Sequence, residues 1–260
     1  MNLDLASKTA VVTGAGRGIG LATVRTLIAE GVHVAGAART VTPELKETGA
    51  LAISADLSTA DGVAAFIDAA RTELDGIDLL VNNVGAGDDV RLGGFLDVDD
   101  VQWARVFDLN LLSAVRASRA ALPSLIERRG AIVNVSSMNS RLPAAAPVAY
   151  SAAKAALAAV GKSLAEEFGP RGVRVNTVSP GVVRTSIWED PDGFGATVAA
   201  AAGVEHGAFL QQIPAAFNIT TGRITEPEEV AALIAFLLSD VAGNITGADY
   251  LIDGGTVKTL

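Results

Sequence analysis

The sequence predicts an α/β fold with a single doubly wound parallel sheet and helices on both of its faces. Short runs of β-branched residues alternate with longer Ala- and Leu-rich stretches along the chain, and this alternation indicates βαβ units with right-handed crossovers. Half of the 260 residues are apolar and 27 are glycine, a composition typical of a helix-covered parallel sheet with tight turns. The length suits one domain, which we place at residues 1–260.

The β-branched runs predict strands at Thr9–Thr13, His33–Ala37, Ala50–Ser54, Leu79–Val81, Ala131–Ser136 and Arg174–Val178, with a last one near Tyr250–Ile252. The stretches between them predict helices near Ile19–Ala29, Ala60–Leu74, Val101–Glu127, Val148–Phe168 and Pro227–Leu238. The alternation is broken at residues 185–222, where Gly, Pro and Ala are frequent. Because this stretch is too long for an ordinary loop, we expect a helical lid or a mobile segment.

The charge balance and the rare residue types exclude several kinds of partner. The net charge is −9, and no basic stripe is present that could neutralise the phosphates of a nucleic acid. Cysteine is absent, and the two histidines, His33 and His206, leave little material for a metal site. No apolar run reaches the length of a membrane span, and no secretory signal is visible. We therefore expect a cytoplasmic protein without nucleic-acid, membrane or metal partners.

A glycine-rich turn joins the first strand to the first helix. Residues 9–20 read Thr-Ala-Val-Val-Thr-Gly-Ala-Gly-Arg-Gly-Ile-Gly. Glycines let the backbone turn sharply and approach a pyrophosphate, whose charge then lies at the helix N-terminus. The spacing is Thr-Gly-x-x-x-Gly-x-Gly rather than the common Gly-x-Gly-x-x-Gly. Taken alone, the turn predicts a phosphate site but would also suit a tight turn in any α/β protein.

Tyr150 and Lys154 lie four residues apart in a predicted helix, so both side chains share one face. A free phenol titrates near pH ~10 and is a poor general acid or base at neutrality. An ammonium held beside it favours the phenolate, lowers the pKa of the phenol and makes it usable near pH ~7. Alone, such a pair is more often a solvated helix face, and the rest of the chain decides between the two interpretations.

The order and spacing of the motifs resemble those of the short-chain dehydrogenase/reductase family. After the glycine turn, Asn82-Asn83-Val84-Gly85 follows the fourth predicted strand. Asn110, Ser137, Tyr150 and Lys154 come next, and residues 176–181 (Asn-Thr-Val-Ser-Pro-Gly) follow the sixth strand. The resemblance covers nearly the whole chain and implies a Rossmann-type fold. Val84 stands where the family usually has Ala, a departure that bears on packing.

The resemblance implies a catalytic tetrad of Asn110, Ser137, Tyr150 and Lys154. Tyr150 would act as general acid/base on the substrate oxygen, and Ser137 would hydrogen-bond that oxygen. Lys154 would bind the nicotinamide ribose, while Asn110 holds a water that links Lys154 to solvent. A nicotinamide cofactor would contact a larger set of residues: Gly14, Gly16, Arg17, Gly18, Ile19, Gly20, Arg39, Asp56, Leu57, Asn83, Val84, Gly85, Tyr150, Lys154, Pro180, Gly181, Val183 and Thr185.

The end of the second strand favours NADP(H) over NAD(H). NAD-binding folds place an acid there that accepts hydrogen bonds from the ribose 2′-OH, whereas this chain has Ala38 followed by Arg39. Nothing then repels a 2′-phosphate, and Arg39 can pair with it by a charge-assisted bond. Arg17 can approach from the glycine turn. Both arginines could instead be solvated, so NAD(H) stays possible. Asp56 is implied to contact the adenine, or it simply begins a helix.

The tetrad predicts an oxidoreductase that interconverts a ketone and a secondary alcohol by hydride transfer, with Tyr150 supplying the proton in reduction. The expected substrate lining is apolar and favours reduction of an apolar carbonyl compound: Met138, Leu142, Val182, Trp188, Phe194 and Phe209. A 3-oxoacyl-(acyl-carrier-protein) reductase and a catalytically silent nucleotide-binding regulator are the alternatives. The glycine spacing disfavours a sugar-nucleotide epimerase. The three-residue gap between Tyr150 and Lys154 disfavours an enoyl reductase.

The helix that carries Tyr150 predicts an oligomer. From Ser151 to Phe168, apolar residues, mostly alanine, cover almost its whole circumference. A helix that covers a sheet on one side only would show a polar outer stripe, so we expect this helix to be buried on both sides. A two-fold axis can bring such a face against itself. We expect a homotetramer, and the resemblance implies a second interface around Ala248–Leu260. A monomer with exposed, helix-favouring alanines is the alternative.

Overall fold

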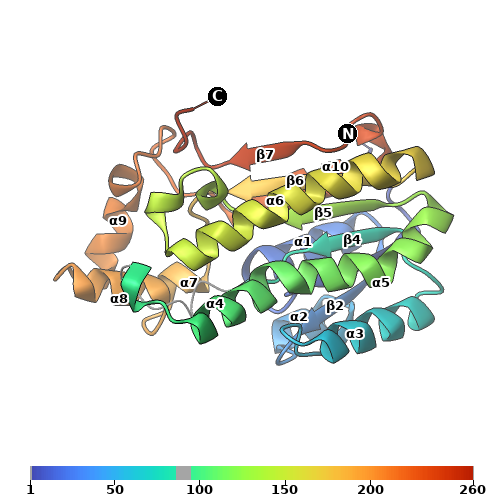
Figure 1. The fold of residues 1–260 in the computed structure, drawn as a ribbon, viewed down its shortest axis with the longest axis horizontal. Helices are drawn as coiled ribbons and strands as arrows, with labels where there is room; N and C mark the ends of the chain where they lie inside the picture. Colours follow the sequence, from blue (N-terminus) through green and yellow to red (C-terminus); the bar gives the residue numbers. More distant parts are fainter. Residues whose placement is uncertain (1, 86–94, 260) are drawn as a thin grey trace.

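The computed structural model describes residues 2–85 and 95–259. Their strands form one parallel sheet in the order β3-β2-β1-β4-β5-β6-β7 (Figure 1). The chain runs outward from β1 in one direction and from β4 in the other, so the strand order reverses between them. The predicted fold class is confirmed. The strands are β1 Thr9–Thr13, β2 His33–Ala38, β3 Leu51–Ser54, β4 Leu79–Asn82, β5 Ala131–Val135, β6 Arg174–Pro180 and β7 Asp249–Ile252.

Helices cover both faces of the sheet (Figure 1). On one face α1 packs on α10, and on the other α5 packs between α3 and α6. The α-helices of the described residues are α1 Gly18–Ala29, α2 Pro43–Glu47, α3 Ala60–Glu73, α4 Asp100–Phe107, α5 Ser113–Arg128, α6 Val148–Phe168, α7 Ser186–Glu189, α8 Phe194–Ala201, α9 His206–Ala216 and α10 Pro227–Leu238.

The alternation of side chains along β1 divides the core between the two faces. Ala10 and Val12 belong to the apolar cluster that includes α1 and α10, whereas Val11 belongs to the cluster that includes α3 and α5. Successive side chains of a strand point to opposite faces, and both faces are covered here, so all five residues of β1 are buried. For this reason the middle of β1 reads as an apolar run, Ala-Val-Val, rather than as an alternating pattern.

Two helical regions differ from the prediction. The helix expected over Val101–Glu127 is divided into α4, one π-helical turn at Asp108–Leu112, and α5. A π-helical turn adds one residue to a turn and leaves the apolar pattern nearly unchanged, so the sequence pattern could not show it. The short helix α2 was not predicted. Its start is marked by Thr42, whose Oγ1 accepts a hydrogen bond from the Leu45 N–H at 3.2 Å.

The segment 185–222 forms α7, α8 and α9, which lie together at one end of the molecule (Figure 1). Phe209, Ile213 and Ala199 are buried in an apolar cluster that also includes Met138 and Val182. The segment is therefore helical, and its action as a lid stays a prediction. No helix of the described residues has the length and apolar character needed to cross a membrane. Leu260, the last residue of the expected second interface, lies outside the described residues.

Candidate active site

The glycine turn is held in a conformation that only glycine suits. Gly14 and Gly18 have φ values of +67° and +53°, a region that residues with a Cβ rarely adopt. A Cβ on Gly14 would lie 3.0 Å from the Val84 Cα, and a Cβ on Gly20 would collide with the Gly14 carbonyl oxygen. The turn therefore brings α1, β1 and the loop after β4 into close backbone contact, with the N-terminus of α1 open for an anion.

Asn83 ties the glycine turn to the end of β4. Its Nδ2 donates hydrogen bonds to the carbonyl oxygens of Thr13 and Gly14, at 3.0 and 3.1 Å. Thr13 Oγ1 in turn accepts hydrogen bonds from the backbone N–H groups of Asn83 and Val84, at 2.9 and 3.1 Å. These contacts join the two strands on either side of the reversal in strand order, where ligands bind in doubly wound sheets.

The ends of β2 and β3 form the outer rim of the same cleft. The side chain of Arg39 is exposed, and the small Ala38 precedes it. Asp56 accepts hydrogen bonds from the Ser58 hydroxyl and backbone N–H at 2.7 and 3.0 Å. These bonds, together with the charge of Arg39, lower the pKa of Asp56. An anion at this rim would lie near the guanidinium of Arg39, and β2 contributes no carboxylate that would repel it.

Lys154 lies inside the protein, with only 3% of its surface exposed. Its Nζ donates a hydrogen bond to the Val135 carbonyl oxygen at 2.9 Å and lies 5.7 Å from the ring centroid of Tyr150. Burial lowers the pKa of Lys154 to about 8, because desolvation disfavours the charged form. One turn of α6 thus holds an ammonium against a phenol, as the four-residue spacing predicts.

The two other residues of the predicted tetrad are Ser137, which follows β5, and Asn110, which lies in the π-helical turn. The Ser137 Oγ accepts a hydrogen bond from the Asn139 N–H at 3.2 Å, which leaves the hydroxyl proton available to a ligand. Asn110 is buried, and its Nδ2 donates to the Val106 carbonyl oxygen at 3.0 Å. A Cβ on Gly85 would lie 3.0 Å from both the Asn110 Oδ1 and the Lys154 Nζ. The structure therefore brings Asn110 and Lys154 together beneath Gly85.

A single cavity of about 1290 Å³ connects these groups. Every residue of the predicted cofactor set except Gly20 lines it, as do Ser137, Tyr150 and Lys154. Gly20 and Asn110 do not line the cavity. They lie close to Gly14 and Gly85, which do, and so influence its shape. Sequence reasoning did not name several lining residues, for example Ala144, Val198 and Phe217. Their place in the cavity depends on how the segment 185–222 and the loop after Ser137 fold over it.

The predicted substrate lining is correct in part. Met138, Val182, Trp188 and Phe194 line the cavity. Phe209 does not, because it is buried in the core of the segment 185–222. Leu142 does not either: it is 38% exposed outside the cavity. Both errors have the same cause, since an apolar residue near a site in sequence can equally serve a local core or the surface.

The chain is similar to known proteins over almost its whole length. A family model described as enoyl-(acyl carrier protein) reductase matches residues 14–257. The chain is 34% identical over 268 residues to 3beta-hydroxysteroid dehydrogenase 1 of Eggerthella lenta, covering 97% of this chain and 94% of that protein. It is 34% identical over 259 residues to the 3-oxoacyl-(acyl-carrier-protein) reductase of Vibrio cholerae, covering 97% and 98%. The crystal structure of L-sorbose reductase from Gluconobacter frateurii, complexed with NADPH and L-sorbose, matches with a TM-score of 0.91, 32% identity and full coverage of both chains.

Proposed function

The chain belongs to the short-chain dehydrogenase/reductase family, and from this premise we propose how its cleft carries out the reaction. The similar proteins are dehydrogenases and reductases of alcohols and carbonyl compounds. The chain is accordingly an oxidoreductase that interconverts a ketone and a secondary alcohol with a nicotinamide cofactor. The observation that carries the proposal is the buried Lys154 ammonium beside the Tyr150 ring, in one cavity with Ser137 and the glycine turn.

In our proposal Tyr150 is the general acid of the reduction. When bound in this cleft, a nicotinamide cofactor would be the source of the hydride for the carbonyl carbon. Negative charge then grows on the carbonyl oxygen, where the Ser137 hydroxyl donates a hydrogen bond and Tyr150 delivers a proton. The Lys154 ammonium stabilises the phenolate that remains. Asn110, adjacent to Lys154, orders the route by which a proton returns, and the oxidation of an alcohol reverses each step.

The residues of the rim support NADP(H) as the preferred cofactor. Ala38 offers no carboxylate to accept a ribose 2′-OH, whereas Arg39 is exposed and lines the cavity. A 2′-phosphate at this place would gain a charge-assisted hydrogen bond. Arg17 lines the same cavity from the glycine turn and is the second candidate partner. NAD(H) binds less well in this proposal because its 2′-OH finds no acceptor at position 38.

The substrate we propose is an apolar ketone, which the segment 185–222 covers as a lid. Trp188, Phe194 and Val198 of that segment line the cavity, as does Met138. A second candidate, the reduction of a 3-oxoacyl thioester, is favoured by the likeness to the Vibrio cholerae enzyme. The test is loss of NADPH absorbance with an alicyclic ketone, a 3-oxoacyl thioester and a ketose. We expect turnover with the ketone. Turnover with none of the three would favour the silent regulator.

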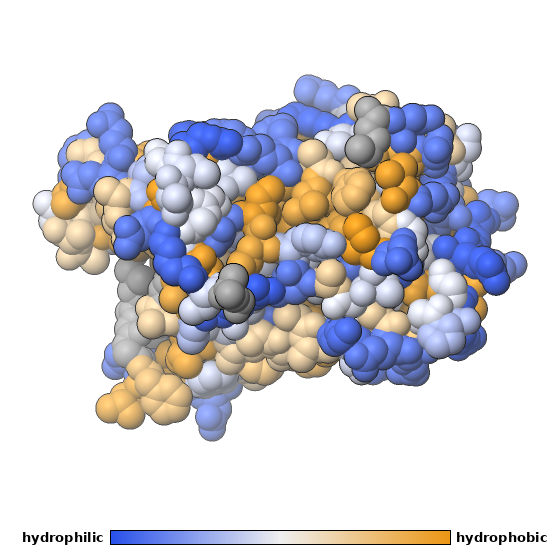
Figure 2. All heavy atoms as spheres, turned by 90° about the horizontal axis from the view of Figure 1, so that it is seen from above, coloured by the Kyte–Doolittle hydropathy of each residue, from blue (hydrophilic) through white to orange (hydrophobic). Residues whose placement is uncertain are grey.

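We also propose a homotetramer, located in the cytoplasm. In the single chain α6 leaves Ala155 and Ala159 exposed and Val160 half-buried. Figure 2 looks onto the side of the molecule that carries β7, and apolar side chains gather across the middle of this face. β7 is an edge strand whose four residues are all only half-buried. Two separate apolar surfaces of this kind support association through two different interfaces.

A further inference from the structure

The two ends of the segment 185–222 are joined to each other at its base. Val183 and Thr225 form an isolated parallel β-bridge. The Arg184 N–H donates to the Thr225 carbonyl oxygen at 2.8 Å, and the Thr225 N–H donates to the Val182 carbonyl oxygen at 3.0 Å. Motion of the segment must therefore occur beyond this bridge, in α7 to α9, rather than by separation of its two ends.

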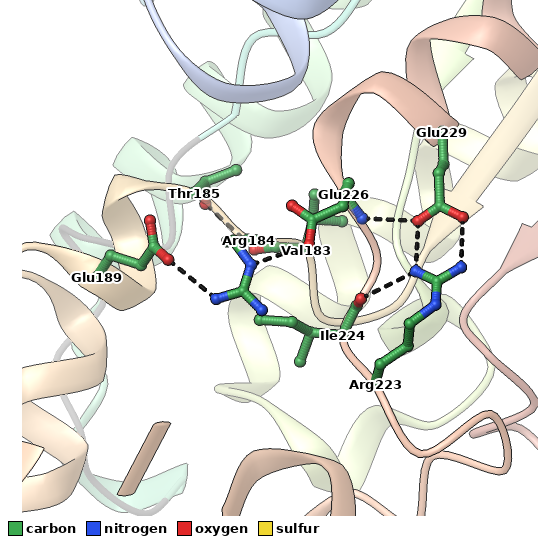
Figure 3. A network of polar contacts seen from close by, with 8 residues as sticks. All are labelled: Val183, Arg184, Thr185, Glu189, Arg223, Ile224, Glu226 and Glu229. Carbon is green, nitrogen blue, oxygen red and sulfur yellow. Dashed lines mark hydrogen bonds and ion pairs between the residues drawn. The ribbon is translucent and has the colours of Figure 1, made fainter. Parts of the chain in front are cut away.

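Arg184 extends this junction to the first helix of the segment. Figure 3 shows its guanidinium between two carboxylates from different elements. Nε donates to the Glu226 Oε1 at 2.9 Å, and Nη1 donates to the Glu189 Oε1 at 3.1 Å. Glu226 is the N-cap of α10, in the body of the protein, whereas Glu189 is the last residue of α7. Arg184 does not line the cavity, although its neighbours Val183 and Thr185 do.

Glu226 is itself fixed by a neighbouring pair. The Glu226 N–H donates to the Glu229 Oε2 at 2.9 Å, in a capping box at the start of α10. Arg223 binds both oxygens of Glu229 at 2.7 Å each (Figure 3). The hydrogen bonds that Glu229 accepts from Arg223 and, as a smaller contribution, from the Glu226 N–H lower the pKa of Glu229 to about 2. Glu226 is thus held in place on the body side of the network, and the Arg184–Glu189 ion pair is the charged contact of this network that reaches α7. Arg17 also reaches α7, through a hydrogen bond from its Nη1 to the Ser186 Oγ at 3.4 Å.

We propose that Arg184 is a positioning residue that holds α7, and with it Trp188, over the substrate side of the cleft. The inference rests on the proposed function, since it assumes that this cleft binds cofactor and substrate. Trp188 packs edge-on against Phe194 and Phe217, with ring centroids 5.7 and 5.8 Å away. Releasing α7 therefore disturbs three aromatic side chains of the lining together.

The size of the effect follows from the exposure of the pair. The side chains of Arg184 and Glu189 are 46% and 45% exposed, and an exposed ion pair changes an equilibrium by about 1.5- to 5-fold. Breaking the pair should raise the open population of α7 by that factor. The effect must shrink as salt screens the charges, because the Debye length falls from about 30 Å at ~0.01 M to about 3 Å at ~1 M salt.

Glu189→Gln tests the proposal, with Arg223→Gln as the matched control. The control breaks a shorter Arg–Glu pair, 2.7 Å against 3.1 Å, that does not touch α7 and whose loss removes no hydrogen bond of Glu226. Hydrogen exchange is followed at the amides of Trp188, Glu189 and Asp190, which bond to carbonyl oxygens in the first turn of α7. In Glu189→Gln they should exchange about 1.5- to 5-fold faster at low salt, and at wild-type rates at ~1 M salt. In Arg223→Gln they should not change.

The kinetic readout separates positioning from chemistry. In Glu189→Gln the KM for the ketone should rise by up to about 5-fold. The kcat should not change, because the variant lowers only the fraction of molecules whose α7 is closed and able to bind the ketone. Unchanged exchange in Glu189→Gln, equal acceleration in Arg223→Gln, or a loss of kcat at constant KM would each overturn the proposal. A wild-type protein that reduces no ketone would refute the proposed function. Hydrogen exchange can be measured without turnover, so it would still test whether Arg184 holds α7.

Discussion

Replacing Lys154 by Met should make the protein more stable and inactive at the same time. Lys154 is buried with its Nζ bonded to the Val135 carbonyl oxygen, and burial is what lowers its pKa. A side chain of similar length without a charge fits the same space. The protein therefore maintains a buried ammonium at a cost in folding free energy, which is expected of a group kept for chemistry rather than for stability.

The magnitude follows from the pKa. A fall from 10.5 to about 8, at 1.36 kcal/mol for each pKa unit, corresponds to about 3 kcal/mol. The lost hydrogen bond to Val135 offsets about 1 kcal/mol of this gain. Lys154→Met should therefore raise the free energy of unfolding by about 2 kcal/mol at pH ~7, which is a Tm increase of roughly 4–8 °C for a chain of this size.

The pH dependence has a definite sign. The unfolded chain keeps the lysine proton up to a pH near 10.5, whereas the folded chain loses it near 8. Between these values the unfolded state binds more protons, so the wild type gains stability as pH rises. The advantage of Lys154→Met is thus full below pH ~8 and shrinks toward pH ~10.5.

Urea unfolding at matched protein concentration, at pH ~7 and pH ~9.5, measures both effects. We expect Lys154→Met to be the more stable protein at pH ~7 and to lose part of that lead at pH ~9.5. NADPH turnover should be absent. A variant that is less stable than the wild type at neutral pH, or whose lead stays constant with pH, refutes the reasoning that burial sets the pKa of Lys154.

Three further predictions concern the cofactor, the glycine turn and the assembly. The pair Ala38→Asp and Arg39→Leu should shift the ratio of kcat/KM values toward NAD, and a wild-type protein that already prefers NAD contradicts this. Gly20→Ala should abolish cofactor binding because its Cβ collides with the Gly14 carbonyl. The control is Gly169→Ala, where a Cβ meets nothing within 4 Å. In a fluorescence titration the control should bind the cofactor as the wild type does. Light scattering should give a tetramer, and a mass near the 26.4 kDa of one chain ends the oligomer proposal.

The sequence predicted the strands well because the central ones, such as β1 and β5, are buried along their whole length and rich in apolar, β-branched residues. β1 is found as predicted, at Thr9–Thr13, and the others differ by a residue or two at their ends. The π-helical turn around Asn110 could not be predicted, because it depends on which backbone carbonyl oxygen accepts the hydrogen bond of each N–H. The helix at Pro43–Glu47 could have been found from Thr42 and Pro43, which form an ordinary helix start.

Much of the cleft was predictable because its glycines and strand ends have fixed sequence spacing. The cavity is lined by Gly14, Ser137 and Tyr150 as the spacing indicates, and their roles in catalysis stay predictions. The substrate side was less predictable. Val198 of α8 lines the cavity, whereas Phe209 of α9 does not. The packing of three short helices determines which of their apolar side chains face the cavity and which face one another.

The central claim is that Tyr150 is the acid/base of a hydride-transfer reaction, and Tyr150→Phe tests it most directly. Stopped-flow titration gives the Kd for NADPH, and steady-state assays with the best ketone give kcat. We expect kcat to fall by about 100- to 10,000-fold, as is usual when a general acid is removed, while the Kd for NADPH stays within about twofold. A Tyr150→Phe protein that keeps more than about a tenth of the wild-type kcat would contradict it.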